Sequence, residues 1–380
     1  MQPRFSTYMP VLTSLRGIAA IWVVIYHFEA ILRISGLQPI TDANDSMLLL
    51  KGYVWVDFFF LLSGFIMTHV YGEQFRNGAS RLQIWNYLSA RLARLYPLHV
   101  FSMLVHLPLI VILYMYLEEM VPVVIPFYPW QGIPVHLFMF QSFTWNYGFT
   151  WNIPAWSIGA EWWTYMLAIG LFFLLHRKKR MNALLLSIIS IMALILLVET
   201  HPKQSLDITW GPGIFRCMTE FTLGIVLYQI YLNKAVQQFI RKDISFYTAA
   251  MAVLLLMHVH LHDVLLIPFF GWIIISGAAN EGRVSWFMSK AFMQAVGNIS
   301  YSVYMMQGLW MNVFFIWMKY QMMTYAITDL ALEVKIIMMA AMVGATILSA
   351  YITYTWVEVK GRKWMYSRLV KMFPSQKAMA

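Results

Sequence analysis

Stretches of about twenty mostly apolar residues recur along this chain with short polar breaks between them, and this pattern constrains its fold more than any other feature. A membrane-spanning helix needs about twenty such residues, and inside a bilayer only helices and closed barrels satisfy all their backbone polar groups. With 60% hydrophobic and 12% charged residues, the chain has too few charges to cover a soluble surface. We therefore expect an all-α integral membrane protein, a bundle of about ten transmembrane helices. The expected spans lie near 11–33, 52–72, 95–117, 152–176, 183–200, 212–232, 244–261, 263–280, 292–318 and 335–358.

The distribution of basic residues predicts how this bundle is oriented. If the N-terminus starts in the cytoplasm, the cytoplasmic segments hold 20 of the 27 Lys and Arg residues, including the run Arg177 to Arg180. The long break at 118–151, on the other side, holds none. By the positive-inside rule both termini are cytoplasmic. We expect a multi-pass protein of the cytoplasmic (inner) membrane, with a membrane domain at 1–360 and a basic cytoplasmic tail at 361–380.

The net charge of +10 comes from Lys and Arg residues spread over several short loops. Because no single domain gathers them into one patch, the sequence does not predict a nucleic-acid-binding surface. The single cysteine, Cys217, excludes a disulfide within the chain and a cysteine metal site. His258, His260 and His262 are followed by Asp263 and alternate as metal ligands sometimes do. Residues two apart on a helix point to different sides, however, and no matching cluster occurs elsewhere. We expect no metal.

Ionisable residues inside the first span are the first candidates for a functional site. Such side chains cost roughly 2.5–3.5 kcal/mol each on insertion, so they usually face a cavity or one another. Arg16 and His27 are eleven residues apart, close to three helical turns, and therefore share one face about 16 Å apart. This face presents a fixed cation near the cytoplasmic end and a titratable base deeper in the membrane.

The second span returns antiparallel and brings Asp57 to about the depth of His27. A carboxylate there could accept a proton from one imidazole nitrogen and orient the other as a base. Ser63 and Gly64 in the same span allow close helix approach. The simpler alternative is that His27 and Asp57 only form a polar clasp between two helices; the presence of Arg16 on the same face favours catalysis.

Arg91 and Arg94 end the second cytoplasmic break. At a spacing of three they share a helix face, and the arginine fork suits phosphate oxygens. A nucleotide-bearing cytosolic molecule would be a natural ligand. Basic residues are also expected at a cytoplasmic boundary from topology alone.

The fourth span opens with Trp156 and Ser157 and contains Glu161 among aromatic residues. Glu161 could bind acceptor hydroxyls, or it could pair with Arg16 or Arg216. Arg216 and Glu220, four apart in the sixth span, are expected to form a structural ion pair.

Together these segments resemble the membrane-bound acyltransferase-3 family, which transfers acyl groups to polysaccharides, lipopolysaccharide and related glycans. The likeness runs over nearly the whole chain in the family's order. It rests on Leu15-Arg16-Gly17 followed by His27, Val56-Asp57-Phe58-Phe59-Phe60-Leu61-Leu62-Ser63-Gly64-Phe65, Arg91-Leu92-Ala93-Arg94-Leu95-Tyr96-Pro97, Trp156-Ser157 with Glu161, and Gly297-Asn298-Ile299-Ser300-Tyr301-Ser302-Val303-Tyr304.

The resemblance implies an O-acyltransferase domain at 1–360 that moves an acyl group, with acetyl the first expectation, from cytosolic acyl-CoA to a carbohydrate hydroxyl. It makes His27 the essential histidine, Arg16 its partner, and Arg91 and Arg94 the acyl-CoA pair. Trp156, Ser157 and Glu161 become candidate acceptor-binding residues. Gln307 departs from the pattern, because relatives often carry histidine there and glutamine cannot act as a base.

Several alternatives stay open at this level. Arg16 could stabilise the developing oxyanion or bind the donor, and transfer could be direct or pass through an acyl-histidine. A proton-coupled multi-helix transporter using the same buried charges is the rival function, although the chain lacks recognisable inverted repeats. A catalytically inactive scaffold would leave the buried charges unexplained. The expected partners are acyl-CoA, a carbohydrate acceptor and membrane lipid; homo-oligomerisation is open.

Overall fold

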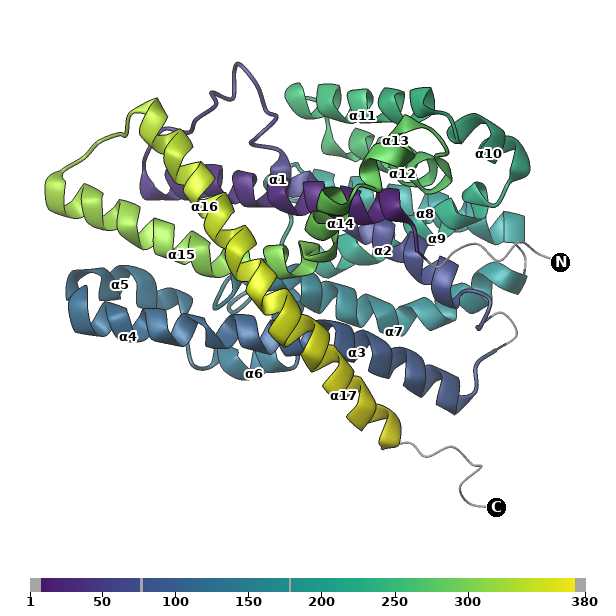
Figure 1. Cartoon of the computed structure of the whole chain (residues 1–380), viewed down its shortest axis with the longest axis horizontal. Helices are drawn as coiled ribbons and strands as arrows, with labels where there is room; N and C mark the ends of the chain where they lie inside the picture. Colours follow the sequence, from purple (N-terminus) through teal and green to yellow (C-terminus); the bar gives the residue numbers. More distant parts are fainter. Residues whose placement is uncertain (1–7, 76–77, 178, 373–380) are drawn as a thin grey trace.

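The protein is a bundle of helices in which several long helices run in similar directions, while the last long helical segment crosses them diagonally (Figure 1). The computed structural model describes residues 8–75, 78–177 and 179–372, and this part of the chain contains no β-strand. The side chains of the predicted basic run Arg177 to Arg180 lie outside the described part. The larger helices are α1 (Pro10–Ser35), α2 (Trp55–Tyr71), α3 (Arg81–Leu104), α4 (His106–Tyr116), α7 (Trp156–Arg177), α8 (Lys179–Thr200), α9 (Gly213–Tyr231), α11 (Asp243–His258), α12 (Leu266–Ala279), α15 (Ser300–Tyr325), α16 (Leu332–Thr353) and α17 (Lys360–Lys371).

Six helical segments in the described part of the chain are long and apolar enough to cross a membrane. Two shorter apolar helices, Asp243–His258 and Asp263–Ala279, accompany them. The all-α membrane architecture expected from the sequence is thus confirmed, while the count of ten spans and the cytoplasmic termini stay predictions. The six long segments are Pro10–Ser35, Gly52–Tyr71, Arg81–Tyr116, Ile153–Leu174, Asn182–Thr200 and Leu332–Lys371.

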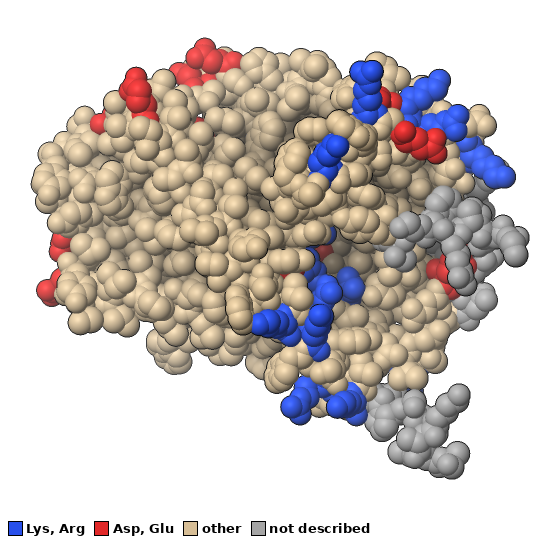
Figure 2. Space-filling view, viewed as in Figure 1, with Lys and Arg blue, Asp and Glu red and all other residues tan. Residues whose placement is uncertain are grey.

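Lysine and arginine gather towards one end of the face shown in Figure 2. Acidic residues dominate the opposite end of that face, and a broad surface with few charges lies between the two ends (Figure 2). This asymmetry agrees with the orientation inferred from the loops.

The third predicted span begins earlier than expected. Helix α3 starts at Arg81, where Ser80 and Gln83 form a capping box, so Arg91 and Arg94 lie within the helix and not in a break before it. Hydropathy alone missed the first part of α3 because the segment 81–94 is polar, although Arg, Leu and Ala are strong helix formers.

The ninth and tenth predicted spans also differ from the structure. The ninth is divided into α14 (Ala291–Asn298) and α15, with Ile299 between them. The division falls where Gly297 meets α1, since a Cβ on Gly297 would lie 2.2 Å from the Thr13 carbonyl oxygen. The tenth continues through a π-helical segment, Tyr354–Val359, into α17, so the start of the predicted tail is helical. Helix α17 packs on α3, and the Trp85 indole donates to the Leu369 carbonyl at 2.9 Å.

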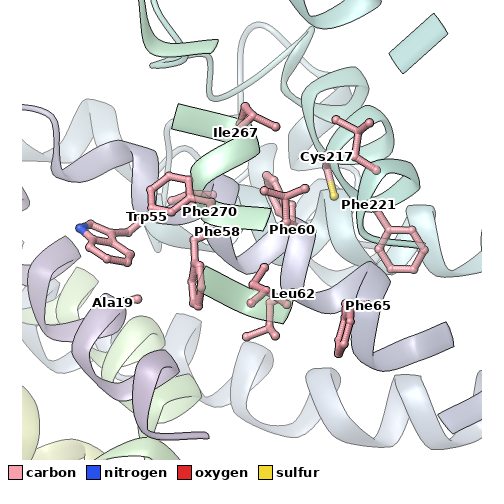
Figure 3. Packing of buried hydrophobic residues seen from close by; sticks show 14 of the residues in the cluster. Ala19, Trp55, Phe58, Phe60, Leu62, Phe65, Cys217, Phe221, Ile267 and Phe270 are labelled. Atoms are coloured by element: carbon pink, nitrogen blue, oxygen red, sulfur yellow. The ribbon is translucent and has the colours of Figure 1, made fainter. Parts of the chain in front are cut away.

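Two glycines allow α2 and α9 to pack in close contact. A Cβ on Gly64 of α2 would lie 2.0 Å from the Phe221 carbonyl oxygen, and one on Gly224 of α9 would lie 2.0 Å from the Leu61 carbonyl oxygen. The backbones of α2 and α9 therefore touch, as small residues allow in membrane helices. Aromatic and aliphatic side chains of α2, α9 and α12 fill the core around this crossing (Figure 3).

Helix α1 packs along α15 and crosses α14. A Cβ on Gly17 would lie 2.8 Å from the backbone of Val296 and Gly297. This close crossing places Arg16, the neighbour of Gly17, near the break between α14 and α15.

Candidate functional site

A cavity of about 200 Å³ lies inside the bundle between α1, α2, α3, α7 and α15. Three cations and one carboxylate face it: Arg16, Arg91, Arg94 and Glu161. These four residues come from three separate segments and were all predicted as site residues from the sequence. The remaining lining residues are Val56, Phe59, Phe60, Leu62, Ser63, Ile66, Met67, Leu95, Ser157, Ile158, Tyr165, Ser300, Tyr301 and Tyr304.

A second cavity, of about 300 Å³, adjoins the first near the start of α1. The two share Arg16 and Arg94 among their lining residues. A further arginine, Arg362 of α17, lines only the second cavity. Arg16 and Arg94 therefore lie where the two adjoining cavities, together called the passage below, meet.

Arg94 has a protein counter-ion at this junction. Its guanidinium forms an ion pair with Glu358 in the π-helical segment and lies 5.0 Å from the centre of the Tyr301 ring. The second oxygen of Glu358 accepts a hydrogen bond from Ser302 at 2.6 Å. Sequence analysis did not single out Glu358, although a carboxylate in the last predicted span was a usable signal.

Arg91 has no such carboxylate among the described residues. Its Nη2 donates to the Tyr71 hydroxyl at 3.0 Å, and its guanidinium lies 5.2 Å from the Tyr71 ring centre and 5.9 Å from that of Tyr165. Its Nε is buried without a hydrogen-bond partner. Arg91 therefore keeps hydrogen-bonding capacity for an anionic ligand.

Arg16 makes no hydrogen bond or ion pair within the described part of the chain. It lies in electrostatic range of Arg94, Glu358 and Glu161. An unpaired guanidinium between two cavities is the second group in the passage that can receive an anion.

Glu161 is held by two hydroxyls that also belong to the cavity wall. Its Oε1 accepts hydrogen bonds from Ser63 at 2.6 Å and from Tyr165 at 2.5 Å. Its Oε2 accepts none from the residues that the structure describes, and remains available to a ligand. Sequence analysis noted Ser63 only for helix packing and missed Tyr165, although the four-residue spacing from Glu161 was readable.

His27 and Asp57 do not form the contact that the sequence predicted. Both oxygens of Asp57 accept hydrogen bonds from Arg216, at 2.6 and 2.7 Å, while His27 Nδ1 lies 3.1 Å from the Gln307 Oε1. The physical reason is helix packing: α2 lies against α9, which carries Arg216, whereas α1 lies along α15, which carries Gln307. The predicted contact by which Asp57 would orient His27 is therefore wrong. A catalytic role of Asp57 stays a prediction.

Arg216 is buried, and its hydrogen bonds go to other groups in the core of the bundle. Glu220, the predicted partner, lies 3.9 Å from Arg216 Nε and is thus a weaker neighbour than Asp57. Arg216 also donates to the backbone carbonyls of Ile208 and Tyr53. Its guanidinium lies 5.7 Å from the ring centre of Trp156, so this predicted site residue packs in the core and does not line the cavity.

Ser157, by contrast, reaches the cavity, where its hydroxyl lies 2.7 Å from the Tyr304 hydroxyl. Tyr304 and Phe59 line the same cavity, with ring centres 6.1 Å apart. His27 is not among the lining residues. Its hydrogen-bond partner Gln307 is three residues beyond Tyr304 on α15, about 4.5 Å along the helix axis, so His27 lies about one helical turn beyond the cavity.

The alternating histidines turn to separate partners. His258 Nδ1 lies 2.9 Å from the Ser46 hydroxyl, and His260 Nε2 lies 2.8 Å from the Ala43 carbonyl oxygen. His262 Nε2 lies 3.3 Å from a carboxylate oxygen of Glu199. Across the described ranges no group of three or more His, Cys, Asp or Glu is placed to hold a metal ion.

Comparison with known proteins supplies the class of this membrane bundle. The profile of the acyltransferase-3 family, described as an acyltransferase domain, matches residues 10–355. The chain therefore belongs to this family and is a multi-pass membrane protein with an acyltransferase domain.

Two curated relatives agree with this assignment. The chain is 31% identical over 252 residues to the acyltransferase MdmB of Streptomyces mycarofaciens, covering 60% of this chain and 58% of the relative. It is 36% identical over 92 residues to protein 2 in the picA locus of Rhizobium radiobacter, covering 24% of this chain and 40% of the relative. The matches thus span less than two thirds of each relative's length. No solved structure matches this chain.

Proposed function

We propose that this protein is an integral membrane O-acyltransferase that moves an acyl group, acetyl in the first instance, from cytosolic acyl-CoA to a carbohydrate hydroxyl. The observation that carries the proposal is the passage lined by Arg16, Arg91 and Arg94 within the acyltransferase-3 domain. The family match favours acyl transfer over a proton-coupled transporter.

The donor is assigned to the two joined cavities. Acyl-CoA carries several phosphate oxygens, and guanidinium groups bind phosphate oxygens with bidentate geometry. Arg16 and Arg91 lack a carboxylate counter-ion among the described residues, and Arg362 adds a cation to the second cavity. That cavity, of about 300 Å³, is at the lower end of the range for small-molecule sites. The nucleotide would occupy it and direct the thioester towards Tyr304.

The acceptor is assigned to the far side of Phe59 and Tyr304, where His27 lies. Nε2 of His27 takes the proton of the attacking hydroxyl as the sugar oxygen bonds to the thioester carbonyl carbon. The tetrahedral intermediate then breaks its carbon–sulfur bond, and the proton passes from His27 to the departing CoA thiolate. The free oxygen of Glu161 can accept a hydrogen bond from the acceptor or donor within the cavity.

The proposal places the protein in the cytoplasmic (inner) membrane with the second cavity facing the cytosol. The gathering of Lys and Arg at one end of the molecule supports this orientation (Figure 2). The acceptor would be an envelope or exported glycan, such as a polysaccharide or lipopolysaccharide, reached from the other side of the membrane.

Mass spectrometry of cell-surface glycans tests the function directly. Cells that express the chain should show glycans heavier by one acyl group than cells lacking it, and His27→Ala should remove this difference while the protein remains in the membrane. An exposed arginine, Arg241, offers a matched control, and Arg241→Ala should leave the modification intact. Identical glycan masses with and without the chain would refute the carbohydrate acceptor.

A further inference from the structure

Gln307 is the hydrogen-bond partner of His27, and its own contacts determine which atom it presents to the imidazole. The Gln307 side chain is fully buried. Its Oε1 lies 3.1 Å from His27 Nδ1, and its Nε2 donates to the Tyr304 carbonyl oxygen at 3.0 Å. One amide thus bridges His27 and the residue that lines the cavity.

The Tyr304 carbonyl oxygen fixes the orientation of this amide. A carbonyl oxygen only accepts hydrogen bonds, so it must face the amide nitrogen of Gln307. The reversed orientation would place two oxygens 3.0 Å apart without a hydrogen between them. Since the nitrogen faces Tyr304, the oxygen must face His27, and His27 Nδ1 must carry the hydrogen.

A second acceptor supports the same proton position. The backbone carbonyl of Val23, four residues before His27, is a second acceptor within reach of this ring. Nδ1 is the ring nitrogen nearest the backbone, and in His106 it is Nδ1 that lies 2.8 Å from the Ser102 carbonyl oxygen four residues earlier. With the hydrogen on Nδ1, the neutral ring has its lone pair on Nε2, for which the described residues supply no hydrogen-bond partner.

We propose that Gln307 is a positioning residue that fixes His27 in the tautomer whose Nε2 is the base. This inference rests on the acyl-transfer function proposed above. Gln307 thus has the orienting role that the sequence analysis predicted for Asp57. A glutamine suffices for this role, because the residue only accepts a hydrogen bond and transfers no proton. During transfer the hydroxyl proton moves to Nε2 and later to the CoA thiolate, while the Nδ1 hydrogen stays on His27 and remains donated to the Gln307 Oε1.

Two substitutions at Gln307 separate orientation from general destabilisation. Gln307→Met keeps the length of the side chain but removes the acceptor, whereas Gln307→Glu keeps an acceptor oxygen. Loss of an orienting acceptor costs up to about 10⁴-fold in a serine protease triad. We expect Gln307→Met to lower kcat at least roughly tenfold and Gln307→Glu to retain more activity than Gln307→Met. The KM for acyl-CoA should change less than about twofold, because the donor is held by the arginines.

Asn312 provides the matched control on the same helix. It is also a buried amide, and its Nδ2 donates to the Gly308 carbonyl at 3.1 Å. Asn312→Leu should leave kcat near the wild-type value. Equal kcat values for Gln307→Met and the wild type would overturn the inference, as would equal losses in the methionine and glutamate variants.

Nitrogen-15 NMR of histidine-labelled protein in lipid nanodiscs tests the tautomer without any enzyme assay. The His27 signals are identified by their absence in His27→Asn. We expect a protonated Nδ1 and an unprotonated Nε2 in the wild type, and a mixture of tautomers in Gln307→Met. A hydrogen on Nε2 and none on Nδ1 in the wild type would refute the inference. If the wild type transferred no acyl group, the proposed function would fail while this measurement still decided the tautomer.

Discussion

Removing Asp57 should destabilise the folded protein. Asp57 and Arg216 are 0% and 1% exposed and share two hydrogen bonds. Asp57→Leu would remove the carboxylate that binds the buried Arg216 cation and leave Glu220, 3.9 Å away, as its ion-pair partner. Breaking a buried pair by removing one partner costs about 3–5 kcal/mol, and each 1.4 kcal/mol changes the folding equilibrium about tenfold. The ratio of folded to unfolded protein should fall at least about a hundredfold.

Thermal unfolding in detergent, followed by size-exclusion chromatography of a fluorescent fusion, measures this effect. We expect Asp57→Leu to lower the unfolding midpoint by about 5 °C. Combining it with Arg216→Met and Glu220→Met should restore most of the midpoint, because replacing a whole buried ion cluster with apolar residues is often neutral. Lys203→Met, which breaks an exposed pair with Asp207, should change stability by less than about 1 kcal/mol.

The result that would refute this reasoning is a stable Asp57→Leu protein. If that variant kept the wild-type midpoint and lost acyl transfer, Asp57 would act in the chemistry, as the sequence alone suggested. A triple variant no more stable than the single variant would also contradict the account.

The remaining predictions concern the cavity and the helix crossing. Arg91→Ala should raise the KM for acyl-CoA about tenfold or more with a smaller change in kcat, since a charge-assisted hydrogen bond contributes about 1.5–3 kcal/mol; an unchanged KM in steady-state kinetics would remove Arg91 from donor binding. Glu161→Gln should lower transfer while Tyr165→Phe has a smaller effect, because Ser63 still holds the carboxylate; equal rates for wild type and Glu161→Gln would exclude a role for its charge. Gly224→Val should sharply reduce the yield of folded protein, because even a Cβ would lie 2.0 Å from the Leu61 carbonyl oxygen; a wild-type chromatography profile would contradict the α2–α9 contact.

Much of the site could be predicted because its signals are local in the sequence. Apolar stretches predict membrane helices because charges and unpaired backbone groups are costly to bury in lipid. The same cost makes Arg16 and Glu161 conspicuous, whereas Arg91 and Arg94 were noted for their spacing of three. The structure brings all four to one cavity. Tyr165 could have been added by the same reasoning, because it lies one turn from Glu161.

The pairing of buried residues could not be predicted because it depends on which helices touch. Asp57 finds Arg216, 159 residues away, since Gly64 and Gly224 let α2 and α9 meet. His27 finds Gln307, 280 residues away, since α1 lies along α15. A single sequence shows that such groups need partners but does not show which helix supplies them.

Transfer of a radiolabelled acetyl group by the purified protein in lipid nanodiscs tests the central claim most directly. With acetyl-CoA and a glycan acceptor, the wild type should move the label to the acceptor. His27→Ala should bind acetyl-CoA with similar affinity and transfer none of the label. Wild-type transfer rates in His27→Ala, or no binding of acetyl-CoA to the wild type, would contradict the account.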